Sequence, residues 1–437
     1  MMPNRMRRRA MTQNPKRLPR KYREIHVAQM SKSGVPTKNK RPSRKYRRRP
    51  SNLMKEYARR MRKNIWLETH IWHAKRFHVK ELWGYKIPWT PCDRAGRAAY
   101  RAVAKHCLVQ DISYYGCIEI EGPFSVLKEG FQKICSQECG LTLTANVFIR
   151  GNREGSVDLF KVNSYPFNAI GNVTFIWKPE QNSDNQRVLW IWVHPSFFSE
   201  VLEELVKLFE LESVNNSNES DVMQIEDENP SQPTKREEKL NFITKNNAST
   251  RNSEYKNVKN RVRILSLKDT LNRFRLTGPL SHAVLFKAFK IYDNEILTDC
   301  NTWFTDWLNE NSDNKKSHKS QSRYWQGLDK ISSPSELDPS IVISLNVFDP
   351  RLNRAPKRMK ALPALDTEFL MTGPPKDAPK SLSNSAIWNA NVRKRILNEM
   401  LSTHEINTKR SKEVLVPGET SNFEFTLQPL PILVIQR

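Results

Sequence analysis

Three features are missing from this sequence of 437 residues, and each absence excludes a class of protein. No run of about 18 apolar residues occurs, so we expect no segment that spans a bilayer. The N-terminus lacks the apolar segment of a signal peptide, which excludes the usual secretory route. The six cysteines include no C-x-x-C pair. That pattern disfavours a zinc or disulfide framework and is typical of reduced thiols in the cytosol or nucleus.

Acidic residues are scarce in the first quarter of the chain. Residues 1–100 contain 29 Lys and Arg against 5 Asp and Glu, a balance of +24. The other 337 residues contain 43 basic and 41 acidic residues, a balance of only +2. Because nearly all of the excess charge lies at one end, we predict that this end binds a polyanion, nucleic acid before membrane.

Residues 1–52 are predicted to form a basic, mostly extended arm. Six prolines interrupt any long helix, and too few apolar residues are present for a core. The arm is expected to become ordered on RNA, although a solvated tail, a nuclear localisation signal or an import peptide would have a similar composition. The candidate RNA-binding residues of the arm are Arg7, Arg8, Arg9, Lys16, Arg17, Arg20, Arg44, Lys45, Arg47, Arg48 and Arg49.

Residues 53–90 are predicted to be a basic helix rich in aromatic residues and histidine. Met54, Tyr57, Met61 and Ile65 recur at helical spacing, so one side can pack on protein. The other sides carry cations that can meet phosphates and release counterions. These are Arg59, Arg60, Arg62 and Lys63.

Asn64–Tyr85 concentrates three histidines and three tryptophans in 22 positions. Two interpretations stay open, a helix that plugs into the core and a surface that stacks on unpaired bases. A zinc site would need a fourth ligand, and a histidine nucleophile or base has no Ser or Cys beside it, so we predict neither metal nor catalytic residues here. The candidate RNA contacts are Trp66, His70, Trp72, His73, Lys75, Arg76 and His78.

The rest of the chain is predicted to be an α+β body of mixed sheet and helices in layers, with residues 91–212 as its first half and 261–437 as its second. The expected strands are Ser113–Glu121, Val147–Ile149, Ser156–Val162, Val173–Trp177, Arg187–Val193, Ile341–Phe348 and Leu430–Ile435. The expected helices are Ala95–Val109, one beginning at Phe124, Ser196–Leu211 capped by Ser196, and Ala386–Leu401. We expect a mobile segment in which Trp303, Trp307 and Trp325 are aromatic anchors, and a solvated loop or a second phosphate contact at Lys315–Arg323.

Residues 213–260 are predicted to be a disordered linker that loops out of one domain, because they are rich in Asn, Ser and acidic residues. On its two sides the sequence repeats a pattern of strand, Gly-Pro turn and helix, at Ile118–Phe131 and again at Phe274–Phe289. Two similar halves would resemble the aminomethyltransferase fold, but no residues of a folate or one-carbon site are identifiable.

Several motifs give the chain a resemblance to a known family. They are WLETHIWHAKRFH (Trp66–His78) followed by WGY, RRRAM (Arg7–Met11), KRLPR (Lys16–Arg20), LVQDISYYGCIEIEG (Leu108–Gly122), TFIWK (Thr174–Lys178), LWIWVHP (Leu189–Pro195), NRFRLTGPLSH (Asn272–His282) and LVPG (Leu415–Gly418). Together they resemble the largest protein subunit of eukaryotic ribonuclease P and ribonuclease MRP. The chain stops before the Trp/Gly-rich C-terminal module of that family, so it is expected to be a short or truncated form.

The resemblance implies an RNA-binding scaffold in the nucleus and nucleolus. In that family the RNA cleaves phosphodiester bonds, in tRNA 5′-leader removal and in precursor rRNA processing, and the protein stabilises the RNA. The implied partners are the ribonuclease P and MRP RNAs, the other protein subunits and, indirectly, precursor tRNA, with no cofactor. The alternatives that composition leaves open are a general basic RNA-binding or ribosome-assembly factor, a metal-dependent nuclease using His70, His73 and His78, and a transferase.

Overall fold

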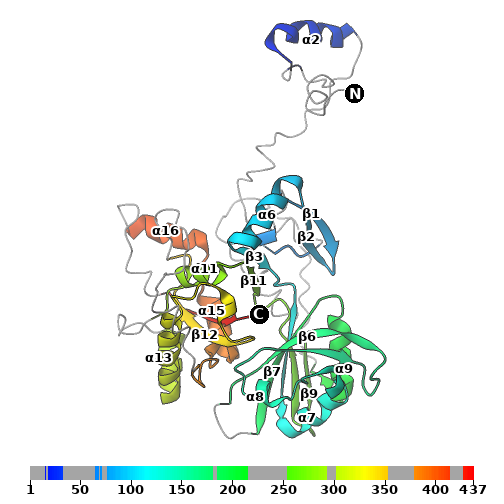
Figure 1. Ribbon diagram of the computed structural model, residues 1–437, viewed down its shortest axis with the longest axis vertical. Coiled ribbons are helices and arrows are strands. Elements are labelled where there is room, and N and C mark those ends of the chain that lie inside the picture. The colour runs from blue at the N-terminus through cyan, green and yellow to red at the C-terminus, as the bar shows by residue number, and fades with distance from the viewer. Residues whose placement is uncertain are drawn as a thin grey trace, which may run out of the picture. The chain divides into compact units, whose positions relative to one another are not determined.

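The computed structural model describes residues 15, 18–32, 64–67, 69–70, 76–180, 185–214, 253–292, 302–352, 378–413 and 427–437. The chain divides into two compact units, Met1–Arg59 and Arg60–Arg437. In the first unit, Pro19 precedes a short 3-10 helix η2 (Arg20–Tyr22), which continues into helix α2 (Arg23–Lys32; Figure 1). Helix α2 buries none of its residues.

The second unit is built around an antiparallel sheet of seven strands in the order β5-β6-β7-β4-β10-β9-β8. Its strands are β4 (Gly116–Pro123), β5 (Gly155–Phe160), β6 (Ala169–Trp177), β7 (Gln186–Val193), β8 (Glu212–Ser213), β9 (Glu254–Asn257) and β10 (Val262–Ser266). Helices α7 (Phe124–Gln132), α8 (Asn146–Ile149) and α9 (Phe198–Leu208) and the 3-10 helix η3 (Gln137–Cys139) complete this part. The predicted α+β class is therefore confirmed.

Both faces of the central strands are buried, which explains the unbroken apolar run Leu189–Val193. Leu189 and Ile191 lie in the core that α7 and α9 cover. Trp190 and Trp192 point to the opposite face, where Val342 and Trp388 from the far end of the chain pack on them. Alternate side chains thus enter two different cores, and each needs apolar residues.

The second core lies around a two-stranded sheet, β12 (Val342–Val347) and β13 (Leu430–Ile435), at the positions that the sequence predicted. Helices α11 (Ser281–Ala288) and α13 (Ser312–Gly327) pack on this core. The other helices of this part are α12 (Trp303–Glu310), α15 (Ala390–Glu399) and α16 (Thr403–Glu413), with 3-10 helices η5 (Pro334–Glu336) and η6 (Ala386–Trp388). Trp303, Trp307 and Trp325 are at most 5% exposed, which agrees with their predicted role as anchors. The expected solvated loop is wrong, because Lys315–Arg323 lies within α13.

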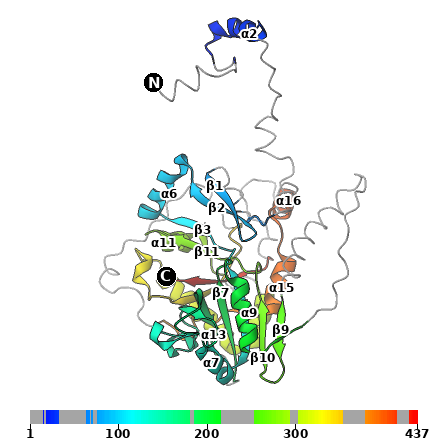
Figure 2. The ribbon, with the colours of Figure 1, turned by 90° about the vertical axis from the view of Figure 1, so that its right-hand side faces the viewer.

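Two small antiparallel ribbons and one helix complete the second unit. They are the hairpin of β1 (Phe77–Leu82) and β2 (Tyr85–Pro91), helix α6 (Asp93–Lys105), and the ribbon of β3 (Leu108–Asp111) and β11 (Phe274–Thr277). Both views show α6 beside the hairpin and α11 beside the β3–β11 ribbon (Figures 1 and 2).

Three local predictions are wrong for identifiable reasons. The helix expected through Asn64–Tyr85 is a hairpin from Phe77 onward, because β-branched and aromatic residues flank a two-residue turn. Val147–Ile149 is helical and not a strand. Ser196 does not cap α9, since its hydroxyl is bonded to the ring of His194 instead.

Most of the predicted linker, residues 215–252, lies outside the described residues. The prediction of disorder is wrong at its two ends, because β8 includes Ser213 and β9 lies within the last residues of the linker, and the two strands pair antiparallel at the edge of the seven-stranded sheet. The chain therefore leaves one sheet edge and returns to it. The repeated pattern of strand, Gly-Pro turn and helix is present twice, as β4–α7 and β11–α11, but β4 is central in the large sheet whereas β11 pairs only with β3 among the described strands.

Candidate nucleic-acid interface

The β1–β2 hairpin occupies the second half of the histidine- and tryptophan-rich stretch. Its loop is Trp83-Gly84, and both residues have positive φ, 53° and 81°. A two-residue loop with two positive φ angles matches the right-handed twist of the strands, and glycine at the second position relieves the steric cost. Tyr85 and Ile87 are buried beneath the hairpin. The WGY motif therefore has a structural function as a turn followed by an anchor.

Side chains at the hairpin tip fasten it to the large sheet. The hydroxyl of Tyr85 donates to the carboxylate of Asp269. The Trp83 ring meets the His194 ring edge-on at 4.4 Å between centroids. Burial lowers the pKa of His194, so its ring is neutral at pH 7 and its Nδ1 accepts the Ser196 hydroxyl at 2.6 Å. The position of the hairpin is therefore fixed by contacts with the ends of strands and loops of the body.

The structure places the described candidate residues in different environments. His70 is 4% exposed and its Nε2 lies 3.2 Å from the carbonyl oxygen of Asp111, so it occupies the core. His78 and Arg76 are exposed at β1, and Trp66 is half-buried. Arg20 is exposed in the first unit. An RNA contact by these residues stays a prediction.

The other candidates lie outside the described residues. They are Arg7, Arg8, Arg9, Lys16, Arg17, Arg44, Lys45, Arg47, Arg48, Arg49, Arg59, Arg60, Arg62, Lys63, Trp72, His73 and Lys75.

Charge and aromatic surface coincide on the hairpin and on the helix that follows it. Residues 76–111 contain seven Lys and Arg and three Asp and Glu. The Nζ atom of Lys80 lies 4.5 Å from the centre of the Trp89 ring, and Trp89 is 52% exposed. Next along the chain, Tyr100 of α6 is 75% exposed between exposed arginines. A cation beside an exposed ring is the combination that binds phosphates and stacks on bases.

Helix α6 was missed as a functional element by the sequence reasoning. The sequence predicted a helix at Ala95–Val109 and gave it no role. The signal was present in the spacing: Arg97, Arg101 and Lys105 recur every four residues, with Tyr100 between them. Cations at this spacing share one helical face, so a search for charge periodicity would have found the stripe.

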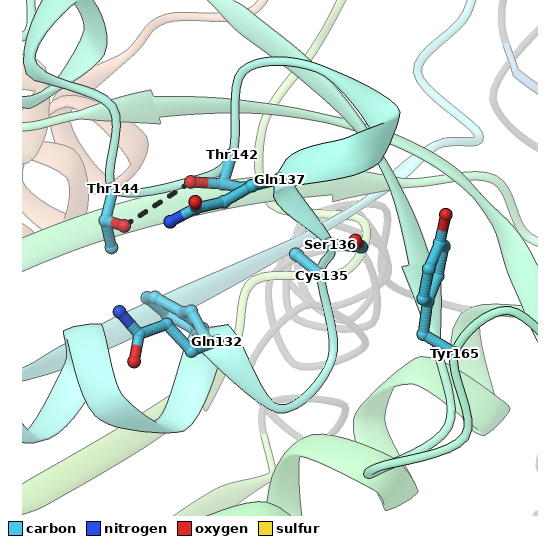
Figure 3. A pocket seen from close by; sticks show the side chains of 8 residues that line it. Gln132, Cys135, Ser136, Gln137, Thr142, Thr144 and Tyr165 are labelled. Atoms are coloured by element: carbon cyan, nitrogen blue, oxygen red, sulfur yellow. Dashed lines mark hydrogen bonds between the residues drawn. The ribbon is translucent and has the colours of Figure 1, made fainter.

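A pocket of about 330 Å³ lies elsewhere, against the end of α7 (Figure 3). Its polar lining includes Gln132, Gln137 and the hydroxyl groups of Thr142 and Thr144, which are hydrogen-bonded to each other at 3.5 Å. Burial raises the pKa of the Cys135 thiol at its wall to about 12, so this cysteine is not a thiolate nucleophile at pH 7. None of the lining residues is charged.

Metal sites and membrane spans are both absent from the described part of the chain. It contains no group of three His, Cys, Asp or Glu side chains that could hold a metal ion. None of its helices has both the length and the apolar character needed to cross a bilayer.

Comparison with known proteins bears on the whole chain. A family profile described as the N-terminal part of the ribonucleases P/MRP protein subunit POP1 matches residues 45–123, which include the hairpin and α6. The human ribonucleases P/MRP protein subunit POP1 is 34% identical over 470 aligned residues, which cover all of this chain and 46% of the human protein. The chain belongs to the POP1 family.

The POP1 relatives are longer than the part that is matched. The Caenorhabditis elegans subunit popl-1 is 33% identical over 221 residues, covering 50% of this chain and 27% of the worm protein. This chain therefore spans less than half the length of these two relatives. Among solved structures, the aminomethyltransferase T of the glycine cleavage system from Bartonella henselae is 14% identical with a TM-score of 0.29, covering 51% of this chain and 43% of that one.

Proposed function

We propose that this chain is an RNA-binding scaffold subunit of ribonuclease P and ribonuclease MRP. The observation that carries the proposal is the coincidence of two independent features. Residues 1–100 hold +24 of the total charge of +26, and the POP1 profile matches residues 45–123 at the junction between that charge and the folded body. A polyanionic RNA is the partner that such a charge distribution fits.

The scaffold would stabilise a catalytic RNA and would not itself cleave phosphodiester bonds. The proposed reactions of the particles are 5′-leader removal from precursor tRNA and processing of precursor rRNA. The proposed partners are the ribonuclease P RNA, the MRP RNA and the other protein subunits, with precursor tRNA contacted indirectly. The place of action would be the nucleus and the nucleolus.

Purification of bound RNA tests the proposal directly. The tagged chain is captured from nuclear extract and its RNA is sequenced, beside a variant with Arg44, Lys45, Arg47, Arg48 and Arg49 changed to Gln. Enrichment of the ribonuclease P and MRP RNAs with the wild type, and a clear loss with the variant, is the expected result. An unspecific RNA population would contradict the scaffold function and leave a general basic RNA-binding protein.

A further inference from the structure

We propose that the exposed face of α6 is an RNA-binding site in its own right, in which Arg97, Arg101 and Lys105 bind phosphates and Tyr100 stacks on an unpaired base. This inference rests on the proposed function, because it names a surface through which a scaffold subunit would hold its RNA. It concerns residues outside the arm and outside the histidine- and tryptophan-rich stretch.

The four side chains lie on one side of the helix. Arg97, Arg101 and Lys105 are spaced by four residues, and Tyr100 lies three residues after Arg97. With a rise of 1.5 Å per residue, the first and last cations are about 12 Å apart along the axis. All four positions are exposed. The face is therefore a continuous strip and does not depend on a rearrangement of the helix.

Among the side chains that the structure describes, no carboxylate pairs with the cations of the strip; the side chain of Asp93, four residues before Arg97, lies outside them. Among the residues that the structure describes, Arg97, Arg101 and Lys105 form no ion pair and no side-chain hydrogen bond. The nearby carboxylates have other partners. Glu81 pairs with Lys86, and Asp111 accepts the hydroxyl of Thr69 and the backbone N–H of Ser113. The cations are thus available to a ligand at no cost in broken ion pairs.

The exposure of the Tyr100 ring distinguishes this strip from an ordinary solvated helix face. It is 75% exposed, the second highest fraction among the large hydrophobic residues that the structure describes. A tyrosine ring in water gains nothing for folding, whereas an exposed ring on the same helix face as two arginines offers a platform for a base whose phosphates the arginines bind. The combination of aromatic ring and cations fits single-stranded RNA.

Packing behind the helix holds the strip outward. The opposite side of α6 carries small residues, among them Ala95, Ala99 and Ala102. The α6 C-terminus is fixed where the backbone N–H of Leu280 donates to the carbonyl of His106 at 3.0 Å. Gly278 lies so close that a Cβ atom there would be 2.5 Å from that same carbonyl oxygen. The side with small residues can approach the body closely, and the cations stay on the surface.

The charge and the lack of apolar area favour RNA over a protein partner. A docking face for a protein helix would present apolar residues at i, i+3 and i+4, whereas here those positions are cationic around one aromatic ring. Val103, 39% exposed, lies off the strip. We therefore propose RNA as the ligand of this face, and the experiment below would reveal a protein subunit if one binds there.

The chain contains its own matched control. Helix α13 exposes Lys315, Lys319 and Arg323, which have the same spacing of four residues as the α6 cations. Its aromatic residues Tyr324 and Trp325 are buried. A variant with Lys315→Gln, Lys319→Gln and Arg323→Gln removes the same charge from a helix that has no exposed ring.

The experiment measures the affinity of the full chain for a labelled transcript of the ribonuclease P RNA of its own organism, at several salt concentrations. The α6 variant Arg97→Gln, Arg101→Gln, Lys105→Gln is compared with the wild type and with the α13 variant, after thermal unfolding has shown that all three fold. Because each phosphate contact contributes about 0.7–0.9 to the slope of log K against log salt, we expect the α6 variant to lower the slope by about 2–3. The α13 variant should leave it unchanged, because Lys315, Lys319 and Arg323 lie on the solvated face of a core helix, and this result would exclude the alternative of a second phosphate contact at Lys315–Arg323.

A second pair of variants tests the stacking. Tyr100→Ala should weaken binding about fivefold to a hundredfold, the range for loss of one stacked base. Tyr100→Phe, which keeps the ring, should bind like the wild type.

The outcomes distinguish a failure of the α6 site from a failure of the scaffold function. If the wild type binds the transcript and the α6 variant binds equally well with an unchanged slope, the α6 site is overturned and the scaffold function stands. Equal losses in the α6 and α13 variants would show a general charge effect and also overturn the site. If the α6 variant binds the transcript like the wild type but no longer captures a protein subunit from nuclear extract, α6 is a protein-docking face. A wild type that does not bind the transcript would overturn both proposals.

Discussion

Helices α6 and α13 carry cations at the same spacing but are held in the fold in opposite ways. Helix α13 buries five of its residues, among them Gln321, Tyr324 and Trp325. Helix α6 buries none of those whose side chains the structure describes, and its exposed face carries Tyr100. Tertiary packing supplies most of the stability of helices in proteins. The cations of α13 thus lie on the solvent-facing side of a helix whose other side is in the core. The cations of α6 lie around an exposed aromatic ring that does not contribute to folding.

The largest expected contrast comes from removing the aromatic ring of each helix. Trp325→Ala should lower the free energy of unfolding by about 3–5 kcal/mol, because the ring is 2% exposed and stacks on Phe286 at 5.7 Å. Tyr100→Ala should change it by less than about 0.5 kcal/mol. Urea unfolding followed by tryptophan fluorescence and circular dichroism measures both. Similar losses for the two variants would show that α6 contributes to the core after all.

A substitution at Gly278 should loosen α6 while leaving α13 in place. Its φ of 131° is a conformation that other residues rarely adopt, and the new Cβ would meet the carbonyl oxygens of His106 and Ala102 at 2.5 and 3.1 Å. Gly278→Ala should cost about 1–3 kcal/mol from strain alone, with the clash adding to it. Hydrogen exchange should speed up in α6 and stay unchanged in α13.

Gly140→Ala is the matched control for Gly278→Ala. Gly140 also has a positive φ, 112°, but a Cβ atom there would have no neighbour within 4 Å. The control therefore reports the backbone strain without the clash. Equal exchange rates in α6 for the two variants would show that the contact with His106 does not hold the helix.

One buried polar residue fixes α13 in a way that α6 lacks. The side-chain Nε2 of Gln321 lies 2.9 Å from the carbonyl oxygen of Ser381 and 2.8 Å from that of Asn384, so it holds the turn before η6. Gln321→Leu removes the donor to the buried Asn384 carbonyl, whereas the Ser381 carbonyl keeps the backbone N–H of Asn384 at 3.1 Å. The variant should cost about 1–3 kcal/mol in urea unfolding. Lys319→Gln, on the exposed side of the same helix, should stay within about 0.5 kcal/mol. A neutral Gln321→Leu would mean that water replaces the amide.

Strands that contribute to two cores were the best predicted part of the fold. Periodicity and β-branched or aromatic content identified Arg187–Val193 and Leu430–Ile435 within one residue of the observed bounds, because both faces of these strands are apolar. The Asn64–Tyr85 stretch failed for the opposite reason. Its aromatic residues fit a helical stripe and a hairpin equally well, and only the positive φ at Trp83 and Gly84 decides between them.

The sequence predicted where the positive charge of the candidate site lies, but it did not predict which side chains are exposed there. Composition located the excess of cations in the first 100 residues, and the motifs identified the family. Exposure depends on contacts between distant segments, which composition does not contain. His70 was grouped with exposed His78, although a contact with Asp111, 41 residues away, buries it. Tyr100 received no role because its exposure depends on where α6 packs.

The smallest expected effect concerns His282, in the helix α11 that lies between the two compared helices in sequence and contacts both regions. Helix α11 follows the Gly278 turn at the end of α6, and its His282 ring packs against Trp325 of α13 at 5.5 Å. Burial lowers the pKa of His282, and its Nε2 lies 2.8 Å from the Leu328 carbonyl oxygen. The unfolded chain, with a histidine pKa of about 6.5, therefore binds a proton more readily than the folded chain. Stability from the neutral ring is complete above that pH and is lost as the pH falls below it.

We expect the difference in unfolding free energy between the wild type and His282→Gln to shrink from pH 7 to pH 5, while hydrogen exchange in α6 stays the same in both proteins. A difference that is constant with pH would mean that His282 titrates alike in the folded and unfolded chains. A change in α6 exchange would mean that α11 couples the two helices, and that α6 is not held independently of the core.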